Sequence, residues 1–415
     1  MNKRQLNHYR QAIKYLESFS GGHIKDYINS PEKLYCFADF LSHFDHPERK
    51  INFIHVAGTS GKGSVCSYIN NGLQKSNKKI GLYISPHLNT AIERISINNE
   101  YIAPQQFLHY YRKIKKIIDQ GVKPPSYLGL LLTIGFLYWS EMKCDYVVLE
   151  TNVGGGNDFT NIIPAPVASV ITNIGLDHQK LLGNSLSSIA HHKAGIIKGG
   201  SAFFTGENRQ QILKIFTQQC QLHKVPMTVV RSSNKYFASQ NIALAKEVIY
   251  YLTNRWIKTI INCSLPARQE IVQTNPLIMI DGAHNPDKVK ALVANIKKNK
   301  IKPTFLIIGF SGNKNWPLML KLLAPLAANI ICTRSLLAPH AAQNPQIIAT
   351  LAQKINRRAK VSYFWDNQTA LRFLLTNCHR HNTAIITGSL YLAGEIRTHW
   401  FDEKYILTHR TSFKV

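Results

Sequence analysis

The sequence predicts a two-domain α/β protein, and three observations carry this prediction. The chain has 415 residues, more than one hydrophobic core commonly organises. Apolar, strand-like runs alternate with helical patterns in two series, which indicates parallel sheets with helices on their faces. A glycine-rich turn joins the first strand of the first series to the helix after it. We expect a first domain over residues 1–270 and a smaller one over residues 271–415, with a linker within residues 264–276.

The alternation fixes the expected elements of the first domain. Residues 1–50 are expected to form two short helices with a loop at residues 20–27. Strands are expected at residues 51–57, 80–84, 146–150 and 167–172. Helices are expected at residues 65–74, 104–118, 126–139 and 235–258. The helix at 126–139 is apolar enough to be buried, but its apolar run is too short to span a bilayer.

A second, smaller series predicts another α/β domain. Its strands are expected at residues 277–280, 305–309, 330–333, 361–364 and 384–387. Its helices are expected at residues 287–298, 316–327, 345–356 and 367–377.

Composition places the chain among folded globular proteins, with 45% apolar and 18% charged residues. The polar, helix-patterned start of the sequence has no apolar signal-peptide segment, so we expect a cytoplasmic protein with no membrane partner. Seven scattered cysteines fit a reducing compartment and argue against disulfides and structural zinc.

The net charge of +27 is large. Such a charge permits loose binding to nucleic acid. The lysines and arginines are spread along the chain, however, and a general lysine enrichment of the lineage explains them as well. We therefore expect no nucleic-acid partner and only a mild attraction of polyanionic substrates.

A phosphate-binding loop is predicted where the first strand ends. The turn between this strand and the next helix consists of Gly58, Thr59, Ser60, Gly61, Lys62, Gly63 and Ser64. In a strand–turn–helix context, backbone N–H groups and the helix N-terminus favour anionic oxygens. Lys62 would reach the outer phosphates of a nucleotide, and Ser64 would hold Mg²⁺. The alternative is a glycine-rich turn with an unrelated lysine.

Polar residues follow two further strands at the edge where ligands of parallel sheets bind. Glu150 ends a strand, and a carboxylate there is a natural Mg²⁺ ligand. Taken alone, such a residue is equally well a solvated charge. Asp177 and His178 follow the strand at 167–172, although a single histidine is more often structural. Lys193 lies in a small, apolar stretch, where burial would make it reactive; the alternative is a surface lysine on a helix.

Taken together, these segments resemble one known family over residues 9 to 397. The shared segments are HVAGTSGKGS (55–64), SPHL and ERISIN (85–98), VVLE (147–150), ITNIGLDH (171–178), HHKAGIIK (191–198), LPAR (265–268), DGAHNP (281–286) and TGSLYLAGEIR (387–397). Their order and wording resemble the folylpolyglutamate synthase/dihydrofolate synthase family. The position of Lys62 and Ser64 in the loop is also similar to that in the related Mur ligases.

The resemblance implies a P-loop, Mur-ligase-like ATPase domain followed by a smaller Rossmann-like α/β domain, with ATP and substrates held in the cleft between them. It implies an ATP-dependent ligase that joins L-glutamate to dihydropteroate, to folates, or to both, through an acyl phosphate. Its expected partners are these small molecules alone, and we expect a monomer.

Residue roles also follow from the resemblance. It implies that Ser64 and Glu150 bind one Mg²⁺, and that Glu150, His178 and Lys193 bind a second, with Lys193 carbamylated. Catalytic roles fall on Lys62, Lys193, His178, Asp281 and His284. Asp281 and Arg268 would contribute to nucleotide binding, since a guanidinium suits phosphate or carboxylate.

Several positions depart from the family pattern. These are Asn152, Gly156, His192, Asn313 and His340. The departures leave two alternatives: a related Mur-type ligase with another acid substrate, or a degenerate, non-catalytic nucleotide-binding protein.

Overall fold

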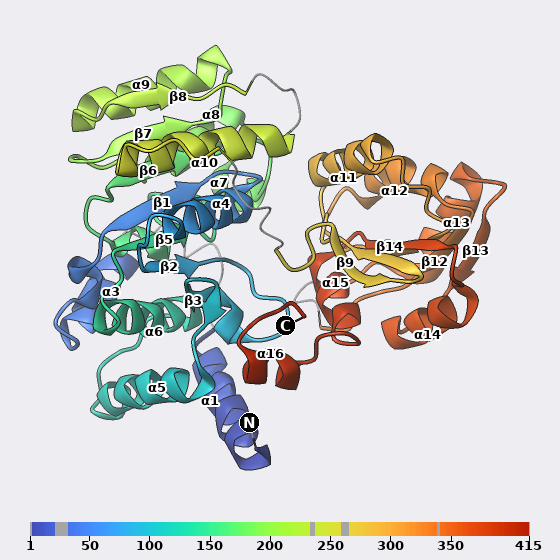
Figure 1. The fold of residues 1–415 in the computed structure, drawn as a ribbon, viewed down its shortest axis with the longest axis horizontal. Coiled ribbons are helices and arrows are strands. Elements are labelled where there is room, and N and C mark those ends of the chain that lie inside the picture. Colours follow the sequence, from blue (N-terminus) through green and yellow to red (C-terminus); the bar gives the residue numbers. More distant parts are fainter. Residues whose placement is uncertain (1, 21–31, 233–236, 259–264, 338–340, 415) are drawn as a thin grey trace. The chain divides into compact units, whose positions relative to one another are not determined.

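The computed structural model describes residues 2–20, 32–232, 237–258, 265–337 and 341–414 (Figure 1). Contacts between Cα atoms divide the chain into two compact units. The first extends to Cys263 and takes in Leu407–Thr411, and the second comprises Ser264–Ile406 and Ser412–Lys414. Each unit is built on one sheet. The domain boundary that we predicted, between residues 270 and 271, lies inside a strand of the second sheet.

The first unit contains an eight-stranded sheet in the order β4-β3-β2-β5-β1-β6-β7-β8. Its strands are β1 (Phe53–Ala57), β2 (Ile80–Tyr83), β3 (Ile95–Ile97), β4 (Glu100–Tyr101), β5 (Tyr146–Glu150), β6 (Ala168–Ile171), β7 (Ala202–Thr205) and β8 (Met227–Val229). Neighbours from β2 to β8 are parallel, while β3 and β4 add an antiparallel edge. The predicted strands β1, β2, β5 and β6 are confirmed, and the other four were not predicted.

Helices cover both faces of this sheet, as Figure 1 shows. The helices of the first unit are α1 (Lys3–Glu17), α3 (Glu32–Ser42), α4 (Lys62–Gln74), α5 (Pro104–Asp119), α6 (Tyr127–Glu141), α7 (Gln179–Leu182), α8 (Leu186–Ala194), α9 (Gln210–His223) and α10 (Phe237–Thr253). Of these, α1 and α5 pack mainly on other helices. Short 3₁₀ turns are η1 (Ser18–Ser20), η2 (Pro47–Lys50), η3 (Ala91–Arg94) and η4 (Phe159–Ile162). Most of the loop expected at 20–27 lies outside the described residues.

Two apolar clusters hold these layers together. Val65 of α4 and Val248 of α10 pack with Ile54 of β1 on one face. Ile189 of α8 and Phe216 of α9 pack with Phe203 of β7 on the other. The predicted buried helix is α6, whose residues from Gly129 to Trp139 are all buried. Among the described residues, no helix has the length and apolar character needed to cross a membrane.

The second unit contains a six-stranded sheet in the order β13-β12-β11-β14-β10-β9. Its strands are β9 (Glu270–Thr274), β10 (Leu277–Ile280), β11 (Phe305–Ile308), β12 (Asn329–Cys332), β13 (Lys360–Tyr363) and β14 (Thr383–Thr387). All neighbours are parallel except β9, which is antiparallel to β10. The expected linker therefore contains a strand, and the five predicted strands are confirmed.

The helices of the second unit lie on both faces of its sheet (Figure 1). They are α11 (Pro286–Lys298), α12 (Trp316–Leu323), the 3₁₀ turn η5 (Ala324–Leu326), α13 (Pro345–Ile355), α14 (Asn367–Asn377) and α15 (Leu390–Arg397). The residues of α16 (Glu403–His409) are divided between the two units. The first three α-helices share one apolar cluster with the sheet, which includes Leu292, Leu320 and Ile348. The four predicted helices of this unit are confirmed.

Candidate active site

The predicted phosphate loop has the geometry of an anion cradle. Strand β1 ends at Ala57, and α4 begins at Lys62 after Gly61, whose φ of 83° is in the left-handed region. The first bond along the helix runs from the Val65 N–H to the Gly61 carbonyl oxygen, at 2.9 Å. The N–H groups of the first turn of α4 have no acceptor within the helix. They point out of its N-terminus, where they can bind an anion.

Two residues of the loop are fixed by the segment that follows β6. The Thr59 N–H donates to the Asn173 carbonyl oxygen at 3.0 Å, and the Ser60 N–H donates to the Asn173 side-chain oxygen at 2.9 Å. The Thr172 hydroxyl in turn donates to the Ser60 carbonyl oxygen at 2.7 Å. These N–H groups hold the loop itself. The first turn of α4, including Ser64, is the part left to bind an anion.

Glu150 meets Lys62 beside the loop. Strand β5 pairs with β1, and its last residue, Glu150, lies beside Val56, two residues before the loop. One carboxylate oxygen, Oε1, lies 3.7 Å from Lys62 Nζ, and the other accepts the Ser85 N–H at 3.0 Å. Glu150 is only 5% exposed. It is therefore a buried partner of the loop lysine, and the alternative of a solvated charge is excluded.

Lys193 lies under the phosphate loop. It projects from α8, is buried, and donates from Nζ to the Gly58 carbonyl oxygen at 2.9 Å. Burial and the nearby Lys62 together lower the pKa of Lys193 to about 7, against the opposite effect of Asp177 and Asp158. The alternative of a surface lysine is wrong. An amine with this pKa is partly neutral near pH 7 and can act as a nucleophile.

His178 borders this cluster through Asp177. It precedes α7 with a φ of 50°, and its side chain is 43% exposed. Its Nε2 lies 3.9 Å from an Asp177 carboxylate oxygen, and Asp177 is near enough to Lys193 to raise its pKa. In the described part of the chain, no group of three or more His, Cys, Asp and Glu side chains is placed to hold a metal ion. The metal-binding roles of Ser64, Glu150, His178 and Lys193 therefore stay predictions.

The second unit gathers its own charged cluster where β10 ends. Asp281 accepts the Ala283 N–H at 2.8 Å and the Gln269 N–H at 3.0 Å. Burial raises the pKa of Asp281, and Arg268 opposes this. Both Asp281 oxygens thus hold backbone turns, one of which carries Arg268.

His284 is the neutral centre of this cluster. Its Nδ1 lies 2.9 Å from the Gly282 carbonyl oxygen, and its Nε2 lies 3.1 Å from Lys288 Nζ. Burial lowers the pKa of His284 well below its ordinary value, and Lys288, Arg268 and Lys314 add to this effect. These three cations around a neutral imidazole suit an anionic group.

Arg94 was missed by the sequence reasoning, although it lies in the ERISIN segment. It is 6% exposed and donates from Nε to His87 Nδ1 at 2.8 Å and from Nη1 to the Tyr83 hydroxyl at 3.3 Å. A further contact joins Nη1 to the Asn152 side-chain oxygen at 3.5 Å. The acceptors of these bonds are neutral. The signal in the sequence was an arginine directly before a strand, a weak one by itself.

Two of the departures from the family pattern meet in the structure. The Gly156 N–H donates to the His192 carbonyl oxygen at 2.8 Å, which ties the loop after β5 to α8. Burial, the adjacent Lys193 and His191 lower the pKa of His192. Asn313 is exposed, and His340 lies outside the described residues.

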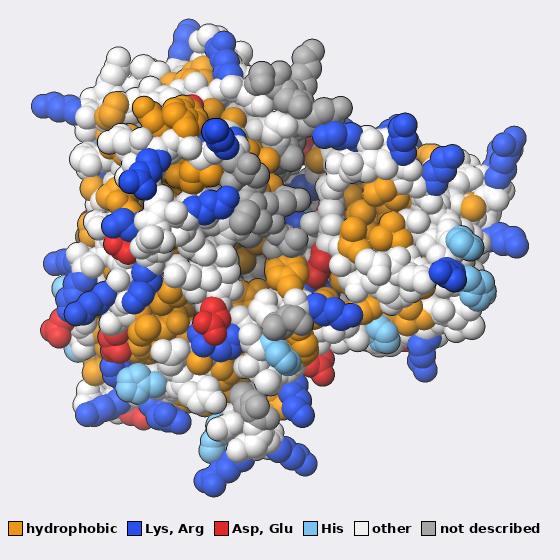
Figure 2. Space-filling model, in the orientation of Figure 1, with side chains coloured by type: hydrophobic (Ala, Val, Ile, Leu, Met, Phe, Trp, Pro, Cys, Tyr) orange, Lys and Arg blue, Asp and Glu red, His pale blue; other side chains and the backbone are white. Residues whose placement is uncertain are grey.

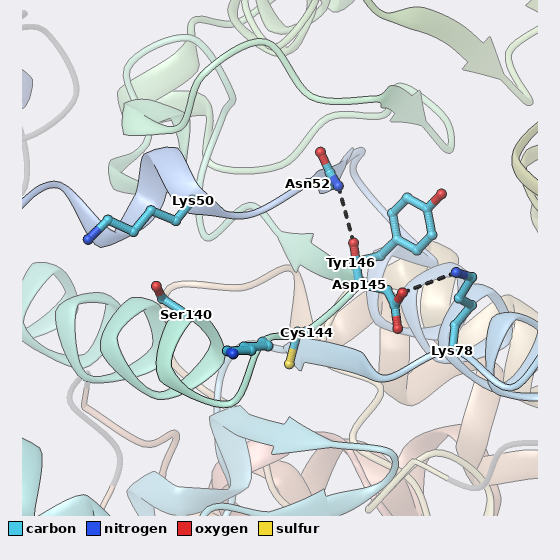
Figure 3. Close-up of a pocket in the computed structure, with 8 residues that line it drawn as sticks. Lys50, Asn52, Lys78, Ser140, Cys144, Asp145 and Tyr146 are labelled. Carbon is cyan, nitrogen blue, oxygen red and sulfur yellow. Dashed lines mark hydrogen bonds and ion pairs between the residues drawn. The ribbon is translucent and has the colours of Figure 1, made fainter.

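A cavity of about 550 Å³ lies at the other end of the first sheet. Figure 3 shows it at the beginning of β5, where Lys78 and Asn52 contact Asp145. The phosphate loop follows the carboxyl end of β1, so this cavity is not the nucleotide site. Figure 2 shows lysine and arginine side chains scattered over the visible face, as their spread in the sequence predicts.

The phosphate loop and the two α/β units define a phosphate-loop protein of the Mur-ligase type. Residues 267–390 match the family description "Mur ligase, glutamate ligase domain". The dihydrofolate synthase/folylpolyglutamate synthase of Bacillus subtilis is 28% identical, with 86% of this chain and 92% of that protein covered. The folylpolyglutamate synthase of Lacticaseibacillus casei is 27% identical, with 94% and 98% covered.

Solved structures agree with these relatives. The crystal structure of folylpolyglutamate synthase from Thermotoga maritima superposes with a TM-score of 0.80 at 25% identity, covering 95% of this chain and 97% of that one. The chain belongs to the folylpolyglutamate synthase family.

Proposed function

We propose that this protein is an ATP-dependent ligase that joins L-glutamate to dihydropteroate, to folates, or to both. The observation that carries the proposal is the cluster of Lys62, Glu150 and Lys193 at the start of α4. It sets a cation, a carboxylate and a reactive amine around an anion cradle. Membership of the family supplies the substrate class.

The proposed reaction has two steps. A substrate carboxylate oxygen attacks the γ-phosphorus of ATP, ADP leaves, and an acyl phosphate forms. The amine of glutamate then attacks the acyl carbon, phosphate leaves, and the nitrogen loses a proton. Both steps need charge neutralisation and positioning more than covalent help from the protein. Lys62 and the N–H groups of the first turn of α4 supply that neutralisation.

We also propose that the site takes Mg²⁺. Mg²⁺ usually keeps several waters and binds one or two carboxylates beside substrate phosphates, so a large protein cage is not needed. Glu150 fits this role, because its Oε1 has Lys62 at 3.7 Å, beyond hydrogen-bond length. Ser64 would complete one site, and Glu150, His178 and Lys193 would hold a second. The metal would polarise the phosphoryl oxygens.

A carbamate on Lys193 is part of this proposal. The neutral amine adds to carbon dioxide and loses a proton, which gives an anionic oxygen ligand where a cation stood. The lowered pKa of about 7 supports it, because it leaves neutral amine at physiological pH. Enzyme depleted of carbon dioxide should lose activity and regain it when bicarbonate is added. Activity that is indifferent to both treatments would count against the carbamate alone.

Anion binding by the second unit completes the proposal. Arg268 and the cations around His284 would contact phosphate or carboxylate groups of the substrates. We further propose that the protein is a monomer. We also propose that it works in the cytoplasm, because the cysteines of the described residues are free, as in a reducing compartment.

The deciding experiment measures phosphate release from ATP with each substrate left out in turn. The proposal expects release only when L-glutamate and either dihydropteroate or a folate are both present, with a product heavier by one glutamyl residue. Release with a different acid would indicate a related ligase. Nucleotide binding without release under any combination would indicate a degenerate, non-catalytic protein.

A further inference from the structure

The backbone that carries Arg268 is held in an unusual conformation. Ala267 and Gln269, on either side of it, have φ values of 52° and 49°, in the left-handed region that residues other than glycine rarely adopt. Such a turn persists only when its surroundings hold it. The Arg268 guanidinium lies over Gly282, since Nη1 is 3.3 Å from where a β-carbon on that glycine would stand.

The Arg268 N–H donates to the Leu265 carbonyl oxygen at 3.1 Å, and three further hydrogen bonds fix this turn. The Gly282 N–H donates to the Ala267 carbonyl oxygen at 2.8 Å, and the Gln269 N–H donates to Asp281 at 3.0 Å. The third bond runs from the Ala267 N–H to Glu270 Oε2, at 2.8 Å. Glu270 therefore accepts the N–H that precedes Arg268, and Asp281 accepts the N–H that follows it.

Glu270 is itself held by Arg397, the last residue of α15. Arg397 Nε donates to Glu270 Oε2 at 2.7 Å, and Nη2 donates to Oε1 at 2.8 Å. The Arg397 side chain is fully buried, and its guanidinium stacks on Phe401 at 4.4 Å. It also donates to the Ser412 carbonyl oxygen. One Glu270 oxygen thus receives both the Arg397 Nε–H and the N–H next to Arg268.

We propose that Arg397 is a positioning residue that acts on Arg268 through Glu270. The proposal rests on the proposed function, in which Arg268 contacts a phosphate or carboxylate group of the substrates. Here we take that group to be a phosphate of the nucleotide. A buried ion pair adds little net stability compared with apolar residues of the same size, so stability alone is a poor reason for it. A two-point guanidinium–carboxylate contact does fix the carboxylate's orientation, and lysine cannot reproduce it.

The test is a double-mutant cycle on ADP binding by the full chain, measured by calorimetry. The single variants are Arg268→Ala and Arg397→Lys, and the double variant combines them. Arg397→Lys should weaken ADP binding about tenfold in the unmutated background, the size expected for a disturbed charged hydrogen bond. In the Arg268→Ala background it should weaken binding less than about twofold, because residues that act as one unit are not additive.

Two further variants separate positioning from folding. Glu395→Gln alters the one carboxylate of α15, which accepts the Leu336 and Leu337 N–H groups and has no hydrogen bond to the 265–269 turn. It should leave ADP affinity unchanged even if it lowers the melting temperature. Should Arg397→Lys fail to fold, Glu270→Gln tests the same link from the other side and should show the same lack of additivity.

Each outcome decides the proposal. Equal weakening by Arg397→Lys in both backgrounds would overturn it, as would no weakening in the unmutated background. If Arg268→Ala binds ADP normally while glutamate-dependent phosphate release persists, Arg397 has no nucleotide contact to position, and the ligase function stands. If the cycle is non-additive but no ligation occurs, the positioning role stands and the proposed ligase function fails.

Discussion

Lys62 is the residue whose removal tests the phosphate loop most directly. Its ammonium lies at the helix N-terminus, 3.7 Å from Glu150. In the proposed reaction, charge builds there on the transferred phosphoryl group. Lys62→Ala should lower kcat by roughly 10²–10³-fold, the usual effect of losing one such stabilising group. The measurement is phosphate release at saturating ATP, L-glutamate and folate.

Lys78→Ala is the matched control for this variant. Lys78 also pairs with a carboxylate, Asp145 at 3.1 Å, but it lies at the amino end of the strands. It should keep near-normal turnover. If Lys62→Ala retained more than about a tenth of the kcat, the phosphate-loop assignment would be wrong.

Lys193 should make stability depend on pH in a predictable direction. Burial lowers its pKa from 10.5 to about 7, so between these values the unfolded chain binds one more proton than the folded protein. Folding stability should therefore rise with pH, by about 1.4 kcal/mol per unit within this window, and the full penalty applies below pH 7. Lys193→Met removes the penalty. Its melting temperature should exceed that of the unmutated protein most at pH 6 and less at pH 9.

These melts are made in buffers free of carbon dioxide, which keep the amine unmodified. Lys180→Met, which replaces an exposed lysine of α7, controls for the general loss of one positive charge. A difference in melting temperature between Lys193→Met and the unmutated protein that stays constant from pH 6 to 9 would show that the pKa of Lys193 is not lowered in the folded protein.

At the scale of elements, the turn before α4 depends on Gly61. An L-residue at its φ of 83° is strained, and a β-carbon there would come within 2.7 Å of the Asn241 side chain. Gly61→Ala should cost about 1–2 kcal/mol from the left-handed conformation alone. It should also weaken ADP binding, because the turn and the first N–H groups of α4 must shift to relieve the contact.

Gly121→Ala separates the strain from the contact. Gly121 has a similar φ of 91°, and a β-carbon there would meet no atom within 4 Å. Both variants should melt at a lower temperature, but only Gly61→Ala should lose ADP affinity by calorimetry. Equal ADP affinities for the two variants would mean that the turn does not shape the nucleotide site.

Clear breaks in the sequence at both ends of an element made its bounds predictable. Strands β5 and β10 and helix α14 were predicted with their observed bounds, because each is flanked by clear breaks. Strands β3 and β8 have three residues each, which are too few to show alternation. Strand β7 has four residues, as many as β10, so its length does not explain why it was not predicted. Helix α9 did carry a helical signal, since Ile212, Leu213, Phe216 and Cys220 lie on its buried side. That signal was overlooked.

In the candidate site, too, some residues could be predicted from the sequence and others could not. Lys62 and Glu150 were predictable because each stands at the carboxyl end of a strand, where the topology brings such residues together. Arg94 is buried by contacts between segments that are far apart in sequence. Lys288 comes beside His284 because the first turn of α11 brings it there. No local pattern encodes such contacts. The metal-binding role of His178 still rests on resemblance.

At the scale of the whole molecule, the protein carries an excess of positive charge that is dispersed over its surface. The chain has 50 lysines and arginines and 23 aspartates and glutamates, so positive charges outnumber negative ones by 27. Figure 2 shows these side chains scattered over the visible face rather than gathered in one patch. Dispersed like charges repel one another and destabilise the compact state without defining a binding site.

Screening this repulsion should stabilise the protein. The Debye length falls from about 30 Å at 0.01 M salt to about 8 Å at 0.15 M, so NaCl added over this range should raise the melting temperature. If screening is worth about 1 kcal/mol, the rise is roughly 2–4 °C for units of this size. KCl should act equally, which separates screening from a specific Na⁺ site, and sulfate is avoided because it binds helix N-termini. A melting temperature that falls with NaCl would show that attraction within ion pairs, such as Lys113 with Glu141, outweighs the net repulsion.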